Sequence, residues 1–149
     1  QEDSPSPFNY SVTTGATFDL LETSSGRVLL SFQAEEERIR RLQRRKFYMK
    51  IQKGVSNRTN DSLEKKFTSK TIHEIRKNKC EVVKSLQVNG VTNISAPVFD
   101  HTNYAIAAIT IPYLQRINKS SKNDINLSKT TKLLKEYSVK LSQSLGYLN

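Results

Sequence analysis

The chain has 149 residues, a mass of 17.0 kDa and a formal net charge of +10. Hydrophobic residues make up 36% of it and the mean hydropathy is −0.59, but the apolar residues are clustered, which indicates one folded domain rather than a disordered chain. Cys80 is the single cysteine, which excludes an internal disulfide and is typical of a reducing, cytoplasmic compartment. No apolar run approaches the roughly 18 residues of a membrane span, and no secretory signal is visible, which argues against a membrane protein.

Helices and strands are mixed along the chain. Thr23 or Ser24 is a natural N-cap for a short helix in which Val28, Leu29 and Phe32 share one face. In chain order, the expected elements of the first half are an edge strand Phe8–Val12, this short helix, a helix Ala34–Arg44, a loop Met49–Asn60, a helix Ser62–Lys79 and a strand Glu81–Ser85.

A β-hairpin is the strongest local signal. Two apolar runs rich in β-branched residues, Ile94–Phe99 and Tyr104–Ile111, are separated by a short polar segment that begins with Asp100 and ends with Asn103. Asp and Asn favour turns and tolerate positive φ, so we expect Asp100 to shape the turn and Asn103 to adopt the left-handed region. The resulting pairs are Phe99 with Tyr104, Ser95 with Ala108 and Asn93 with Thr110.

The two faces of this hairpin differ in chemistry. Because side chains alternate along a strand, one face carries the apolar set Ile94, Ala96, Val98, Ala105, Ala107 and Ile109. The other carries Asn93, Ser95, Ala108 and Thr110, with Pro112 just beyond. A buried polar group without a partner costs roughly 1–3 kcal/mol, so this polar patch requires a partner, for which water, another element or a small polar ligand all qualify. We favour the ligand.

The last helix is predicted over Lys129–Leu145, after a polar loop Asn118–Ser128. It ends at Gly146, the residue type preferred just beyond a helix C-terminus. Its apolar stripe, which includes Tyr137 as a core residue, consists of Leu133, Leu134, Tyr137, Leu141 and Leu145.

Positive charge is concentrated in Glu35–Lys53 and in Lys119–Lys140. Three glutamates, Glu35 to Glu37, open the first segment and arginines follow, which is the order that the helix dipole favours. We interpret these segments mainly as solvated helix surfaces. The alternative is a nucleic-acid-binding module that acts through its basic helices, or a surface that contacts phosphate or a partner.

Three blocks in this order resemble the effector-binding domain of IclR-type bacterial transcription regulators. Leu21–Phe32 is similar to the family's T-x-x-G-[RK]-x-L-L-A segment, and Ile75-Arg76 closes a helix ahead of Glu81–Gly90. Gly90–Ile111 resembles the signature G-V-x-x-I-A-A-P-V-F-D-x-x-G-x-x-x-A-A-[IL]-S-[IV], with Asn103 in place of its glycine. The resemblance covers nearly the entire chain.

The resemblance implies an α+β, GAF-like (profilin-like) antiparallel sheet flanked by helices. It further implies that residues 1–149 are a partial effector-binding domain that lacks the family's N-terminal winged helix-turn-helix domain. DNA would be bound by that absent domain, the partner would be a small organic-acid effector, and the assembly would be a homodimer or homotetramer. We expect no cofactor, no metal, no membrane association and no enzyme activity.

The family's ligand positions fall on the loop that opens the first helix and on one face of the sheet. The resemblance therefore implies, as ligand-binding residues, Thr23, Ser24, Ser25, Gly26, Val83, Asn93, Thr110 and Pro112. Val83 stands where an acidic side chain can occur and Pro112 where a serine is common, so we expect a more apolar ligand than a small oxo acid. Amide groups at a helix start, with the dipole behind them, favour a carboxylate.

Structural roles compete with each assignment. A capping role alone would explain Ser24 and Ser25, and a bond to each other or to water would explain Asn93 and Thr110. The end of a strand would explain Pro112. His73, His101 and Cys80 lack the close spacing of a metal site. An enzyme is disfavoured because the sequence shows no nucleophile–base pair, acidic dyad or phosphate-binding glycine loop.

Overall fold

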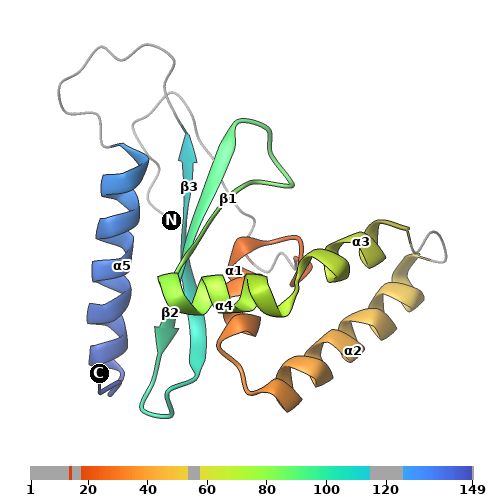
Figure 1. The fold of residues 1–149 in the computed structure, drawn as a ribbon, viewed down its shortest axis with the longest axis horizontal. Helices are drawn as coiled ribbons and strands as arrows, with labels where there is room; N and C mark the ends of the chain where they lie inside the picture. The colour runs from red at the N-terminus through yellow and green to blue at the C-terminus, as the bar shows by residue number, and fades with distance from the viewer. Residues whose placement is uncertain (1–13, 15–17, 54–57, 115–125, 149) are drawn as a thin grey trace.

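A computed structural model of the chain describes residues 14, 18–53, 58–114 and 126–148 (Figure 1). Its elements are α1 (Ser24–Ser31), α2 (Glu35–Lys53), α3 (Arg58–Lys66), α4 (Ser69–Asn78), β1 (Glu81–Lys84), β2 (Val91–Phe99), β3 (Ala105–Leu114) and α5 (Leu127–Ser144). The predicted α+β class is confirmed. The expected strand Phe8–Val12 and most of the expected loop Asn118–Ser128 lie outside the described residues. None of the described helices is long and apolar enough to cross a membrane.

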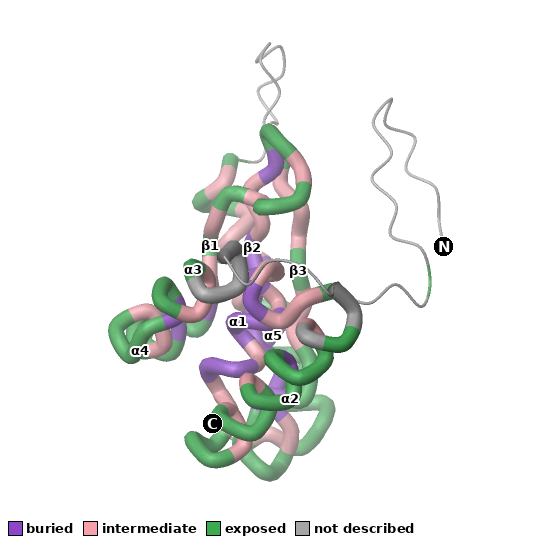
Figure 2. The backbone as a smooth tube through the Cα atoms, turned by 90° about the vertical axis from the view of Figure 1, so that its right-hand side faces the viewer, coloured by how far each residue is buried: buried purple, intermediate pink, exposed green. Residues whose placement is uncertain are grey.

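The strands form an antiparallel sheet in the order β1-β2-β3, with β2 in the centre. α5 covers one face, α1 covers the other, and α4 packs against α1 (Figure 1). Ile94 and Ala96 of β2 pack with Leu134 under α5, while Val28 and Leu30 of α1 belong to the core on the opposite side. Buried residues concentrate along β2 and α1, and α2 and α4 are largely exposed (Figure 2).

The hairpin is present, but its predicted register was wrong by two residues. Ser95 pairs with Thr110 and Asn93 with Pro112, because Tyr104 belongs to the loop and β3 begins at Ala105. The loop chemistry is as expected: Thr102 N donates to Asp100 Oδ1 at 2.9 Å, and Asn103 has φ +62°.

A shift of two residues keeps the alternation of faces, which is why the polar face survives the error. Ala105 is the exception. An irregularity in the pairing beside Val98 and Phe99 places Ala105 opposite Phe99. Ala105 therefore pairs with a residue of the other face and does not belong to the apolar face to which it was assigned.

α5 packs on β2 through two small residues together with Leu134, the one residue of the predicted apolar stripe that is buried. Ser138 and Ser142 are buried, Ser138 Oγ donates to Pro97 O, and Ser142 Oγ accepts from Phe99 N at 2.9 Å. Small side chains permit this close approach, which turns Tyr137 outward. Tyr137 is 61% exposed, so its assignment to the core was wrong.

The helices between α1 and β1 differ from expectation in their bounds. α2 continues to Lys53 and α3 begins at Arg58, so the predicted loop Met49–Asn60 is largely helical. The predicted helix Ser62–Lys79 is instead two helices, because Thr68 caps α4 by accepting from Thr71 N. The weak helix formers around Thr68 had pointed to this position.

Candidate functional site

The N-terminus of α1 is fixed by a turn that precedes it. Asp19 Oδ1 accepts hydrogen bonds from Leu21 N at 2.8 Å and Glu22 N at 3.1 Å. Of the two predicted N-cap residues, Thr23 and Ser24, the N-cap is Thr23, whose Oγ1 accepts a hydrogen bond from Gly26 N at 3.1 Å. The amides of the first helical residues have no partner within a helix, so those of Ser24 and Ser25 are not bonded within α1. Ser24 itself is buried, and Ser25 is half-buried.

Gly26 allows the turn to lie directly against α1. A Cβ atom at position 26 would be 2.2 Å from Leu20 O and 2.7 Å from Leu20 Cα, both backbone atoms. No L side chain fits at that separation. Gly26 therefore serves to position the α1 N-terminus, and in this structure it has a packing role in addition to its predicted place in a ligand loop.

Two cross-strand rows lie on the face of the sheet that α1 covers. The first row joins Glu81, Ser95 and Thr110, and the second joins Val83, Asn93 and Pro112. The structure thus brings the predicted sheet residues together, although in a different pairing from the one expected. Val83, Asn93 and Pro112 are all half-buried.

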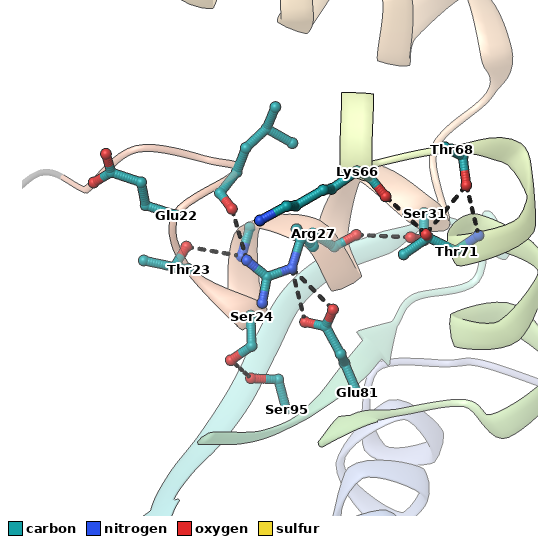
Figure 3. Close-up of polar contacts among 12 residues, drawn as sticks. Glu22, Thr23, Ser24, Arg27, Ser31, Lys66, Thr68, Thr71, Glu81 and Ser95 are labelled. Carbon is teal, nitrogen blue, oxygen red and sulfur yellow. Dashed lines mark hydrogen bonds and ion pairs between the residues drawn. The ribbon is translucent and has the colours of Figure 1, made fainter. Parts of the chain in front are cut away.

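A chain of hydroxyl groups connects α1 to the first row. Ser24 Oγ lies 2.6 Å from Ser95 Oγ, which lies 2.8 Å from Thr110 Oγ1 (Figure 3 shows the first contact). Ser24 and Ser95 are buried, whereas Thr110 is exposed. The two buried hydroxyls satisfy each other, so the polar patch finds part of its partner inside the protein. Thr110 is the exposed residue at the end of this series of hydroxyl groups.

Ser95 was not among the predicted site residues. The sequence placed it on the correct face, but the register error put it opposite Ala108 instead of Thr110, which hid the hydroxyl pair. The alternative in which Asn93 and Thr110 bond each other is not realised, because the Thr110 hydroxyl bonds Ser95.

A buried ion pair at the same face was missed altogether. Arg27 Nε donates to both carboxylate oxygens of Glu81, at 2.9 and 3.1 Å, and Arg27 Nη1 donates to Leu21 O at 2.6 Å (Figure 3). Burial raises the pKa of Glu81, although the bond to Arg27 opposes that shift. The sequence signal for this ion pair was Arg27 itself, the one charged residue of α1. The pair holds α1, the turn before it and β1 together.

We refer to Thr23–Gly26, Val83, Asn93, Ser95, Thr110 and Pro112 as the α1–sheet site. It combines hydroxyl and amide groups with two apolar side chains. No group of three or more histidine, cysteine, aspartate or glutamate side chains positioned to hold a metal ion occurs within the described ranges. The α1–sheet site therefore places hydrogen-bonding groups beside the apolar side chains of Val83 and Pro112.

Comparisons with known proteins agree on one group. Residues 3–143 match the family described as bacterial transcriptional regulator IclR C-terminal. The structure resembles that of Pseudomonas aeruginosa HmgR, with TM-score 0.67 and 20% identity over 98% of this chain and 53% of that chain. A transcriptional regulator from Alicyclobacillus acidocaldarius gives TM-score 0.69 and 19% identity over 96% and 52%.

The C-terminal domain of the E. coli transcriptional regulator KdgR gives TM-score 0.55 and 22% identity over 86% of this chain and 71% of that domain. The chain therefore spans about half the length of HmgR and of the Alicyclobacillus regulator. A search of curated proteins found no significant sequence match.

Proposed function

The chain belongs to the IclR C-terminal family of transcriptional regulators, and on that premise we propose that its α1–sheet site binds a small organic acid. The effector would modulate DNA binding by an N-terminal winged helix-turn-helix domain of the whole protein. In this proposal the regulator acts in the cytoplasm as a homodimer or homotetramer, and the effector shifts the population between conformations of that assembly.

The observation that carries the proposal is the contact between Ser24 and Ser95. It seats the N-terminus of α1 on the polar face of the sheet, with Ser24 Oγ 2.6 Å from Ser95 Oγ. The partial positive charge of a helix N-terminus and its unbonded amides favour an anion. We propose that the carboxylate binds at the amides of Ser24 and Ser25 and also accepts a hydrogen bond from the Thr110 hydroxyl.

The second row of the sheet supports a ligand with an apolar body. Val83 and Pro112 flank Asn93, so a single polar side chain stands between two apolar ones. A glyoxylate-sized acid leaves this row unused. We propose an aliphatic or aromatic carboxylate whose apolar part lies over Val83 and Pro112.

The charge of α2 supports a sensor over a nucleic-acid-binding module. Glu37 pairs with Arg40 and Arg41. Glu64 pairs with Lys46 at 2.8 Å and with Arg45 at 3.1 Å. These internal pairs reduce the field that the helix would present to a phosphate backbone. DNA binding by this chain with steep salt dependence would favour the module instead.

A thermal-shift screen followed by calorimetry tests the proposal. We expect benzoate or octanoate to bind, and the corresponding primary amides and glyoxylate to bind much more weakly. Thr110→Val should weaken carboxylate binding roughly two- to tenfold, which is the range for one hydrogen bond. Thr92→Val, in the same strand pair but on the face under α5, is the matched control and should change nothing. Stabilisation by glyoxylate-like compounds alone, or equal affinities in both variants, would contradict the proposal.

A further inference from the structure

A hollow lies between the turn that precedes α1 and the helix α2. It has a volume of about 490 Å³ and is lined by the turn and by one face of α2. From the turn come Phe18 and Asp19, and from α2 come residues at helical spacings of three and four, which share a face. We call this the α2 pocket, and the α2 residues that matter here are Arg41, Arg44, Arg45 and Tyr48.

The charges around the α2 pocket are unevenly satisfied. Arg45 is buried and bonds Asp19 at 2.7 Å and Glu64 at 3.1 Å. Arg41 bonds Glu37 at 2.7 Å.

Arg44 lines the same hollow, and no carboxylate among the described residues lies within ion-pair distance of it. The pocket therefore carries one uncompensated cation beside two compensated ones.

Two aromatic rings, together with Leu20 and Met49, complete the lining. Phe18 is 48% exposed and Tyr48 is 61% exposed, so both rings keep much of their surface uncovered. A cationic fork next to open aromatic faces matches a planar anion, because guanidinium bonds a carboxylate in its plane and the rings stack on the attached apolar body. The volume falls within the range of about 300–1,000 Å³ that is usual for small-molecule sites.

We propose that the α2 pocket is a second ligand site, which binds a small aromatic carboxylate through Arg44 with its ring against Phe18 and Tyr48. Its lining residues are different from those of the α1–sheet site, so it does not depend on the function proposed above. The turn at Asp19 separates the two sites, since Asp19 lines the pocket while its carbonyl accepts from Thr23 N at 3.3 Å.

The test uses the full chain and benzoate as the probe, with binding measured by calorimetry. We expect Arg44→Gln to weaken the affinity of the pocket for benzoate roughly tenfold, the effect of losing one charge-assisted hydrogen bond. Arg40→Gln is the matched control. It removes the same charge from an exposed residue of the same helix that does not line the pocket, and it should leave benzoate affinity unchanged.

Three results would overturn the inference. Equal weakening by both arginine variants would indicate a general charge effect, and no effect of Arg44→Gln would remove the proposed contact. Loss of all benzoate binding in Thr110→Val would place every bound molecule at the α1–sheet site. Conversely, benzoate binding that is sensitive to Arg44→Gln but not to Thr110→Val supports the α2 pocket even if the α1–sheet site binds nothing.

Discussion

Replacing Gly26 by alanine is the sharpest test of how α1 is positioned. The new Cβ would lie 2.2 Å from Leu20 O, whereas carbon and oxygen atoms in contact are normally about 3.3 Å apart, so the backbone must move by about 1 Å. Overpacking of this kind costs about 1–3 kcal/mol, and the upper end applies because the atoms struck are backbone rather than a flexible side chain. The higher helix propensity of alanine offsets up to about 1 kcal/mol.

The net expectation for Gly26→Ala is a loss of about 2 kcal/mol in the free energy of unfolding, which lowers Tm by about 4–8 °C in a domain of this size. Urea unfolding followed by circular dichroism measures it. Ser25→Ala, one residue earlier in α1, adds no atom and should stay within about 0.5 kcal/mol of the original protein.

The same variant tests the α1–sheet site. A displaced α1 N-terminus moves Ser24 away from Ser95, so carboxylate affinity should fall together with stability. If Gly26→Ala is as stable as the original chain, the turn does not approach α1 as closely as described, and the reasoning about this helix is refuted.

Two further predictions concern the contacts that hold the sheet between its helices. Ser142→Ala leaves the buried Phe99 N–H without an acceptor and should lower the free energy of unfolding by about 1–3 kcal/mol. The exposed control Ser144→Ala should lower it little. Equal effects of the two variants in urea unfolding would argue against the close packing of α5. Because the pKa of Glu81 is raised above its ordinary 4.5 in the folded state, the folded protein binds the extra proton, and this contribution to stability is lost as pH rises from 4.5 through the raised value. Glu81→Gln should flatten this decline of stability with pH. An unchanged dependence of stability on pH would show that Glu81 does not titrate in this window. The ion pair with Arg27 limits how far the pKa of Glu81 is raised.

The local features that the sequence predicted well are those set by backbone chemistry. Thr23 caps α1, Asn103 adopts positive φ, and Gly146 ends α5 with φ +82°. Each depends on one residue type and its immediate neighbours. The alternation of faces was equally robust, because a register error of two residues leaves every β2 side chain on its face.

The features that were missed depend on packing between distant segments. Apolar periodicity placed Tyr137 in the core. In the structure, α5 instead faces the sheet with Ser138 and Ser142, whose hydroxyls form hydrogen bonds with the backbone of β2. A pattern of hydrophobicity cannot show that two serines form a helix–sheet contact. The pair Arg27 and Glu81, 54 residues apart, was hidden for the same reason.

The central claim is that a carboxylate binds where α1 begins, over the polar face of the sheet. Amide chemical shifts of the 15N-labelled chain, recorded during titration with octanoate, test it most directly because they report each backbone N–H separately. We predict the largest changes at Ser24 and Ser25, with further changes at Asn93 and Thr110. Changes confined to α2, or none at concentrations that saturate binding by calorimetry, would contradict the claim.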